Sequence, residues 1–208
     1  MANSVKSKLV VHSTNQSELD RLQKAIEDSC LLQTYIPIPD SMIPVSSQDD
    51  KNISVSELIK RETLRNQNLF ISGYKTISDF KDYRWGTKWD IYPNAMVERI
   101  DSWNLTAVIE TAWDAPVPLF RYLSGLGMSI DALFIDEVPN FIGFYNTYEG
   151  SGYLKINEHL ELPKCGKKSR NIYTRFKNEM NFDVYEYVES LKQSVPDMKE
   201  LTELGYFK

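Results

Sequence analysis

Cysteine is scarce in this chain, with only Cys30 and Cys165 among 208 residues. Two isolated cysteines give no disulfide framework and are typical of a reducing compartment. Long apolar runs are also missing, because no stretch approaches the roughly 18 residues that a membrane-spanning helix needs. Residues 1–12 contain two lysines but no apolar block of the kind found in signal peptides. We therefore expect a soluble, cytoplasmic protein without a membrane partner.

Histidine is equally scarce, which limits metal chemistry. His12 and His159 lie far apart, and neither the histidines nor the cysteines have the spacing of metal ligands. The sequence also lacks the glycine-rich loops that hold nucleotide phosphates and the G-x-S-x-G turn of serine hydrolases. We predict no metal, no cofactor and no catalytic residue.

Carboxylates are the remaining catalytic option. Glu110 with Asp114, and Asp136 with Glu137, are pairs that could perform acid–base chemistry if their pKa values were separated. A chain with 25% charged residues contains many such pairs by chance, and adjacent residues of a strand face opposite ways. These pairs alone do not indicate catalysis, and an enzyme without a known motif stays an alternative.

The composition supports a folded domain with an uneven charge. Hydrophobic residues make up 42% of the chain and aromatic residues 12%, which is ample for a core. The net charge is −5, yet residues 164–177 contain no acidic residue. Six basic residues lie there: Lys164, Lys167, Lys168, Arg170, Arg175 and Lys177. An acidic body with one basic segment is the main electrostatic feature of the sequence.

The N-terminal part predicts a strand followed by a helix. Residues 5–12 end in an apolar run that is typical of a strand. Leu19, Leu22 and Ile26 recur with helical spacing, and Ser17 is a suitable N-terminal cap.

Residues 30–85 predict a mostly helical insertion. Prolines at positions 37 and 39 favour an extended stretch over 35–39, and residues 44–52 are polar and predict an exposed loop. The sequence Ser54-x-x-Glu57 is a capping box for a helix. Its apolar side is predicted at Val55, Leu58 and Ile59. A second helix is predicted to begin near Thr76, with Phe80 facing inward.

The remaining pattern completes an α+β domain. Residues 96–101 and 105–112 predict a β-hairpin, and residues 132–135 predict a further strand. Between them we expect a helix capped by Asp114, with proline in its first turn. Its buried stripe is predicted at Leu119, Leu123 and Leu126. A hairpin over 141–156 and a C-terminal helix over 183–193 follow.

This order of elements predicts a ferredoxin-like fold. Two βαβ halves around an antiparallel sheet give helices on one face. We expect this domain over residues 1–163, with the insertion after its first helix. Residues 164–208 would hold the basic segment and the C-terminal helical extension.

Two tryptophan-bearing motifs are the most specific feature of the sequence. Residues 85–90 read Trp-Gly-Thr-Lys-Trp-Asp, and residues 111–118 read Thr-Ala-Trp-Asp-Ala-Pro-Val-Pro. The residues that define them are Trp85, Gly86, Thr87, Lys88, Trp89, Asp90, Thr111, Trp113 and Asp114.

In this order and spacing, the motifs resemble those of the YubB-like proteins. These are ferredoxin-like proteins of unknown function that conjugative plasmids and bacteriophages carry. Their second motif usually runs Thr-Ala-Trp-Ser-Pro-Pro, where this chain has Asp114, Ala115 and Pro116. The resemblance covers roughly residues 85–153. It implies the fold and an origin in a mobile element, and it supplies no catalytic residues.

Both the motifs and the basic segment have two interpretations. The tryptophans either fill the core, or some of them are exposed and form a binding platform, since aromatic residues dominate binding hot spots. The segment 164–177 is either a solvated loop or a nucleic-acid-binding element. In the second case Tyr173 and Phe176 would stack on bases while the basic residues neutralise phosphates.

Three hypotheses for the function follow. The first is a non-enzymatic phage or plasmid accessory protein in the host cytoplasm, which binds or modulates a host macromolecule. Its partner would be a host or element-encoded protein. The second is a nucleic-acid-binding module that uses residues 164–177, and the third is an enzyme without a known motif.

Overall fold

The computed structural model describes residues 3–45, 53–138, 141–155 and 167–187, and the side chains of all these except 154–155 and 167–171. The chain divides into two compact units. The first unit contains Met1–Val138 and Gly143–Gly152, and the second contains Pro139–Ile142 and Tyr153–Lys208. The predicted boundary between residues 163 and 164 falls outside the described residues.

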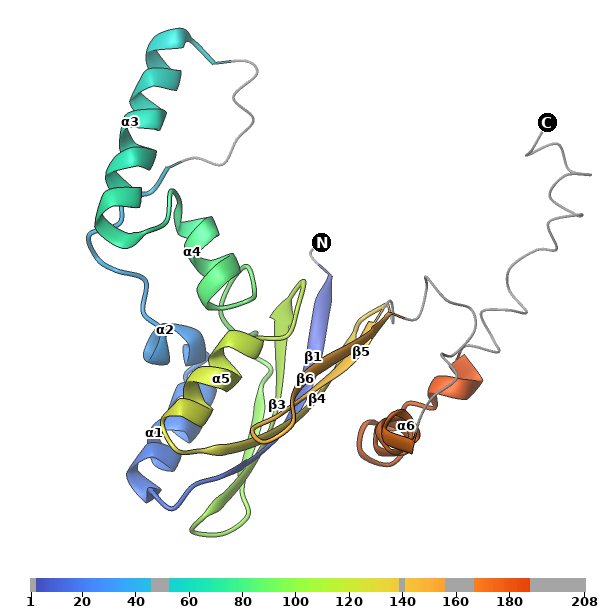
Figure 1. Ribbon diagram of the computed structural model, residues 1–208. Coiled ribbons are helices and arrows are strands. Elements are labelled where there is room, and N and C mark those ends of the chain that lie inside the picture. Colours follow the sequence, from blue (N-terminus) through green and yellow to red (C-terminus); the bar gives the residue numbers. More distant parts are fainter. Residues whose placement is uncertain (1–2, 46–52, 139–140, 156–166, 188–208) are drawn as a thin grey trace, which may run out of the picture. The chain divides into compact units, whose positions relative to one another are not determined.

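Figure 1 shows the elements in chain order. The strands are β1 (Ser4–His12), β2 (Met96–Arg99), β3 (Asn104–Ala112), β4 (Ser129–Asp136), β5 (Phe141–Asn146) and β6 (Gly150–Lys155). The helices are α1 (Gln16–Glu27), α2 (Leu31–Tyr35), α3 (Val55–Ser72), α4 (Ile77–Arg84), α5 (Val117–Gly125) and α6 (Lys167–Met180). None of the described helices is long and apolar enough to cross a membrane.

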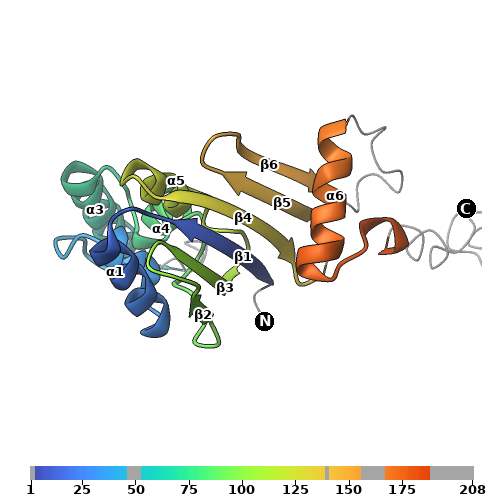
Figure 2. The same cartoon turned by 90° about the horizontal axis from the view of Figure 1, so that it is seen from below.

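The strands form one sheet in the order β2-β3-β1-β4-β5-β6 (Figure 2). Strand β1 runs antiparallel to both neighbours, and Leu9 lies opposite Ala107 of β3 and Ala132 of β4. The first four strands, with α1 after β1 and α5 after β3, have the ferredoxin-like connectivity. The predicted α+β fold with its helical insertion is therefore confirmed.

The core lies between the sheet and helices α1 and α5, which cover the same face (Figure 1). Alternate residues of β1, Val5, Leu9 and Val11, are buried toward these helices. On α1, the predicted stripe of Leu19, Leu22 and Ile26 is buried. Burial of this stripe is the main stabilising force on the helix, because a short isolated helix is marginal in water.

The predicted cap of α1 was wrong by two residues. Asn15 caps the helix, and its side-chain oxygen accepts a hydrogen bond from the backbone N–H of Glu18. The Ser17 hydroxyl instead donates to the same oxygen of Asn15 at 2.8 Å. Asparagine and serine are equally good caps, so the sequence pattern did not distinguish them.

Helix α5 also begins later than predicted. Its N-cap is Pro116, which makes no side-chain cap, and the carboxylate of Asp114 accepts the backbone N–H of Ala115 at 2.7 Å. Leu119 and Leu123 are buried as predicted, but Leu126 is exposed and Phe120 takes the inner position. The helix ends at Gly125, so Leu126 is its C-cap and lies outside the helical stripe.

The insertion contains α2, α3 and α4. Helix α2 was missed, because the prolines constrain only Ile36 and Ile38 directly, and the helix ends at Tyr35 just before them. Helix α4 begins after Thr76 with a complete capping box and buries Phe80, as predicted. Ser54 caps α3 as predicted, and the apolar side of that helix, with Val55, Leu58 and Ile59, is exposed to solvent.

Several predictions fall partly or wholly outside the described residues. Residues 184–187 are helical, consistent with the start of the predicted C-terminal helix, and the remainder of 183–193 is not described. The predicted polar loop is described only at 44–45. Cys165 and His159 are likewise not described.

Candidate functional site

The two tryptophan motifs lie against each other where β3 ends. The hydroxyl of Thr87 donates to the backbone carbonyl of Ala112 at 2.7 Å and accepts its N–H at 3.0 Å. Thr87 is buried, so these bonds are shielded from water and leaving them unmade would be costly. The chain thus brings together two segments that are separated in sequence.

Trp85 and Asp90 are structural. The indole N–H of buried Trp85 donates to the carbonyl of Ile36 at 2.7 Å. The carboxylate of Asp90 accepts the backbone N–H groups of Leu32 and Gln33, both at 2.9 Å. Asp90 therefore caps α2 from a distant position in the sequence, where the residue preceding that helix makes no side-chain cap. Both residues attach the insertion to the motif.

Gly86 is required by its backbone and by its neighbour. It has a φ of 74°, which is in the left-handed region. A Cβ at this position would come within 2.7 Å of the Pro118 Cδ atom. The glycine of the first motif thus packs against the proline of the second.

Trp113 differs from Trp85, because it is exposed and its backbone is strained. It has a φ of 73°, and 53% of its surface is open to solvent. A bulky residue in the left-handed region is rare, and the conformation costs about 1–2 kcal/mol. Two hydrogen bonds hold the turn: the Trp113 N–H donates to the carbonyl of Asn3 at 2.8 Å, and the Thr111 hydroxyl donates to the carbonyl of Asp114 at 2.7 Å.

Lys88 completes an exposed group at the same place. Its ammonium lies 5.9 Å from the ring centroid of Trp89 and 5.9 Å from that of Trp113, within range of a weak cation–π interaction. A surface hollow of about 360 Å³ adjoins it. Six residues line this tryptophan hollow: Ser78, Asp82, Gly86, Thr87, Lys88 and Trp113. The arrangement offers an aromatic face, a cation and a carboxylate side by side.

Trp89 does not fill the core, which the first interpretation of the motifs requires. It is half-buried, and its ring packs edge-on against Tyr92 with centroids 6.2 Å apart. The segment after Gly86 bends and does not extend as a strand, so it carries Trp89 toward the surface. The core interpretation thus fits Trp85, and the exposed interpretation fits Trp113.

The basic segment is helical where it is described, and a solvated loop is excluded there. Tyr173 and Phe176 are buried, and Tyr173 packs edge-on against Tyr185 with centroids 5.4 Å apart. These two rings therefore lack the free face that base stacking needs, and that part of the nucleic-acid hypothesis was wrong.

Two cations of the segment have acidic partners. Arg175 pairs with Glu179 at 2.8 Å, and Lys177 pairs with Asp183 at 2.6 Å. The ion pair raises the pKa of Lys177 and lowers that of Asp183, in both cases first through the hydrogen bond between them. The side chains of Lys164, Lys167, Lys168 and Arg170 are not described, so a phosphate-binding role for them stays a prediction.

The carboxylates that the sequence singled out lie near the start of β1 but have different neighbours. Glu110 lies on β3 opposite Lys6 of β1, whereas the Asp114 carboxylate serves the turn after β3. Asp136 is buried and accepts a hydrogen bond from the side chain of Asn3, and Glu137 accepts the backbone N–H of Ser4 at 3.2 Å. Within the described residues, no three His, Cys, Asp or Glu side chains form a group that could hold a metal ion.

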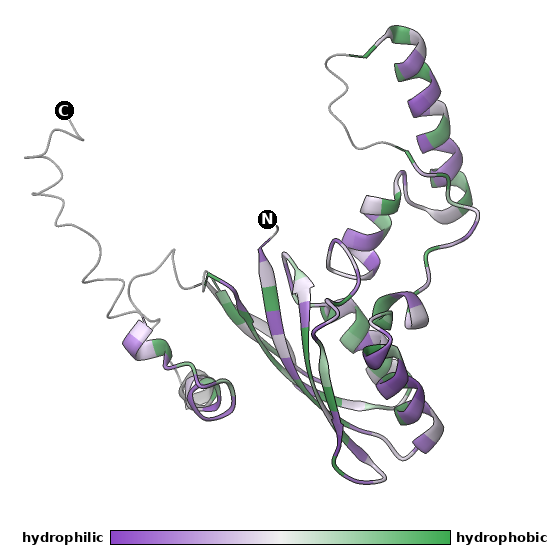
Figure 3. Ribbon diagram, turned by 180° about the vertical axis from the view of Figure 1, so that it is seen from behind, coloured by the Kyte–Doolittle hydropathy of each residue, from purple (hydrophilic) through white to green (hydrophobic). Residues whose placement is uncertain are grey.

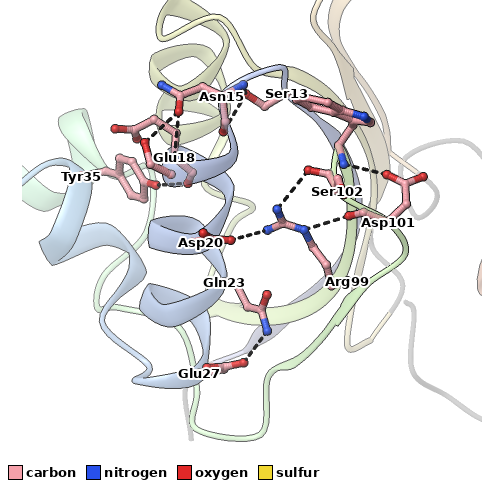
Figure 4. A network of polar contacts seen from close by, with 12 residues as sticks. Ser13, Asn15, Glu18, Asp20, Gln23, Glu27, Tyr35, Arg99, Asp101 and Ser102 are labelled. Carbon is pink, nitrogen blue, oxygen red and sulfur yellow. Dashed lines mark hydrogen bonds and ion pairs between the residues drawn. The ribbon is translucent and has the colours of Figure 1, made fainter.

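A second polar cluster, unpredicted by the sequence analysis, joins α1 to the β2–β3 hairpin (Figure 4). The Arg99 guanidinium lies 3.1 Å from the carboxylate of Asp20 and donates to the carbonyls of Asp101 and Ser102 at 2.9 and 3.1 Å. A hollow of about 620 Å³ lies beside it, with Trp103 and Asn15 among its lining residues. Arg99 and Asp20 are distant in the sequence, and no local motif marks such a pair.

The comparisons with known proteins give one distant likeness. No protein-family model and no curated protein matches the sequence. Among solved structures, the crystal structure of the protein api92 from Yersinia pseudotuberculosis, with the family label DUF1281, has 11% sequence identity and a TM-score of 0.43. The match covers 74% of this chain and 98% of that chain. A likeness at this level supports no conclusion about function.

Proposed function

We propose that this protein is a non-enzymatic accessory protein of a bacteriophage or plasmid that binds a host protein through the tryptophan hollow. The observation that carries the proposal is the exposed, strained Trp113. Strain of this kind persists only where the surrounding structure imposes it, and it concentrates at functional sites. The mobile-element origin is supported by the order and spacing of the two motifs.

The chemistry of the hollow suits a protein surface. Tryptophan is among the residue types most enriched in binding hot spots, and about half of the surface of Trp113 is open to solvent. Lys88 lies beside it and would pair with a carboxylate of the partner, while the exposed Trp113 ring would contact an apolar side chain. The partner we expect therefore presents an acidic residue next to an apolar one.

Affinity capture from host lysate, with and without nuclease, tests this proposal. We would compare the tagged wild-type protein with Trp113→Ala, Lys88→Ala and Trp103→Ala. Trp103 is a matched control, because it is also an exposed tryptophan, 44% open to solvent, and lies in the β2–β3 hairpin. We expect one stoichiometric protein in the wild-type and Trp103→Ala samples, resistant to nuclease, and its loss in the Trp113→Ala sample.

The other outcomes would contradict the proposal in distinct ways. Loss of all partners on nuclease treatment would favour nucleic acid and residues 164–177. Replacing Lys167, Lys168 and Arg170 with alanine would then lower the affinity and the salt dependence of binding. Loss of the partner in Trp103→Ala alone would assign binding to the hollow beside Arg99. No captured protein in any sample would favour a small-molecule ligand or an enzyme.

A further inference from the structure

Helix α3 buries a polar residue against the neighbouring segments of its own unit, and most of its large apolar residues are exposed. Of the residues of α3, all of which are described, only Asn68 is buried. Its amide donates to the carbonyls of Ile43 and Lys75 at 2.8 and 3.2 Å, and its oxygen accepts the Ile43 N–H at 2.8 Å. By contrast, Phe70 is 93% exposed and Ile59 is 62% exposed. Figure 3 shows hydrophobic and hydrophilic residues alternating along this helix.

Five of the six exposed large apolar residues of α3 lie on one face, and only Ile71 lies off it. At 3.6 residues per turn, seven residues fall within about 120° of the helix circumference. This outer face consists of Val55, Leu58, Ile59, Glu62, Asn66, Leu69 and Phe70. Its two ends are apolar, and its middle is polar. A helix that leaves such a stripe in water is typical of a recognition element.

We propose that the outer face of α3 binds the same face of a second copy of this chain, with the two helices antiparallel. We infer a second copy because the face is apolar at both ends and polar in the middle. Two copies of such a face match each other when the helices run in opposite directions. In one register, Leu58 and Ile59 lie against Leu69 and Phe70 of the second copy. The same register places Glu62 against Asn66 of the second copy. A two-fold axis repeats each contact, as in an isologous interface.

The polar middle selects this arrangement. The Asn66 amide donates a hydrogen bond to the Glu62 carboxylate of the other copy, and this pairing occurs twice. The Glu62 carboxylate also pairs with Arg65 of its own chain at 2.6 Å. Parallel helices would place each Glu62 beside its own counterpart, without the Asn66 donor that the antiparallel register supplies. A polar residue in an otherwise apolar stripe specifies register and orientation at some cost in stability.

The size of the face indicates a reversible dimer. Helix α3 has 18 residues and is about 27 Å long. A single helix pair is at the low end of specific interfaces, below about 1,200 Å². We therefore expect association in the range of tens of micromolar, with monomer dominating in dilute solution.

Analytical ultracentrifugation of the full chain tests the dimer, from about 2 to about 200 µM. We expect the mass to rise from monomer to dimer in the wild type and Ile59→Ser to weaken association by about tenfold or more. Ile71→Ser is the matched control, because Ile71 lies on the same helix, is 44% exposed and falls outside the outer face. A monomer at every concentration would overturn the proposal, as would equal effects of the two substitutions. Circular dichroism establishes that each variant is folded.

Cysteine cross-linking tests the register. In a Cys30→Ser, Cys165→Ser background, Glu62→Cys and Asn66→Cys chains would be oxidised separately and as a mixture. We expect the mixed dimer to form faster than either dimer of like chains. Faster dimers of like chains would show parallel helices, and no cross-linking together with loss of a lysate protein in Ile59→Ser would assign the face to another protein. Either result would overturn the proposal. Because Trp113 does not contribute to this face, the dimer and the proposed host-protein binding can fail independently.

Discussion

Thr87 and Ala112 hydrogen-bond to each other in both directions, through one side-chain hydroxyl and both backbone groups of the alanine. This pair joins the two tryptophan motifs inside the protein. It explains why a threonine follows the glycine of the first motif, since a hydroxyl there satisfies a donor and an acceptor at once. The relationship connects the end of the insertion to the end of a central strand.

Replacing Thr87 with valine tests the contribution of that hydroxyl. Valine has nearly the same shape but leaves the Ala112 N–H and carbonyl without this buried partner. We expect a loss of about 1–3 kcal/mol in the free energy of unfolding, measured by urea denaturation. Thr87→Ser keeps the hydroxyl and should lose less. Equal losses in the two variants would show that the methyl group, rather than the hydrogen bonds, stabilises the junction.

Gly73 and Gly86 have the same backbone conformation but different surroundings, so substitutions at the two sites distinguish the cost of backbone strain from the cost of a steric clash. Gly73 has a φ of 81° with open space around it, whereas Gly86 has a φ of 74° and packs against Pro118. We expect Gly73→Ala to cost about 1 kcal/mol of stability, from backbone strain alone. Gly86→Ala should cost about 2–4 kcal/mol, because the added methyl group also displaces the proline ring. Similar thermal shifts for both variants would contradict the close contact.

Trp113 offers a test of strain retained for binding. Glycine tolerates the left-handed conformation that tryptophan and alanine do not, so Trp113→Gly should be more stable than Trp113→Ala by about 1 kcal/mol. Both variants lose the same ring contacts, and the comparison therefore isolates the backbone. Both should lose the captured host protein. If thermal denaturation gave Trp113→Gly a melting temperature no higher than that of Trp113→Ala, the turn would be unstrained.

We expect the stability of the protein to depend on pH through Asp101, which lies in the turn of the β2–β3 hairpin. Hydrogen bonds from the Asn104 side chain and then from the Trp103 backbone lower the pKa of Asp101 below its usual value of 3.8. The folded state therefore favours the ionised carboxylate of Asp101. Its contribution to the free energy of unfolding is complete above the unfolded-state pKa of 3.8 and is lost as the pH falls through the lower pKa of the folded state. Asp101→Asn should thus be less stable than the wild type near pH 6, with the difference shrinking toward pH 3. Urea midpoints across this range would measure it, and a constant difference would contradict the prediction.

The same kind of apolar periodicity predicted helices α1 and α3, but the apolar side of α1 is buried and that of α3 is exposed. Both have an apolar stripe and a side-chain cap. The stripe of α1 is buried because α1 follows β1 directly and packs on the sheet. Helix α3 lies in an insertion, and its polar Asn68 faces inward because the neighbouring backbone supplies three hydrogen bonds. Periodicity identifies an apolar side but does not show whether anything covers it.

The candidate site also shows that the sequence identifies residues but not their burial. The sequence identified the two motifs and their residues, because tryptophan, glycine and proline in close spacing are rare. It did not distinguish Trp85, whose indole is buried, from Trp113, whose ring is exposed. That difference depends on the direction of the chain after α4 and after β3, which long-range hydrogen bonds set. The pairing of Arg99 with Asp20 had no sequence signal for the same reason.

By itself, the sequence determined the order of the strands and of helices α1, α3, α4 and α5, the ferredoxin-like class and the location of the helical insertion. Those properties follow from local preferences: alternation in strands, apolar spacing in helices, and the backbone limits of proline and glycine. Only the tertiary structure decided which apolar surfaces stay in water, where the two motifs meet, and which tryptophan is exposed. These depend on contacts between residues far apart in the chain, and their energies arise only when the fold brings those residues together.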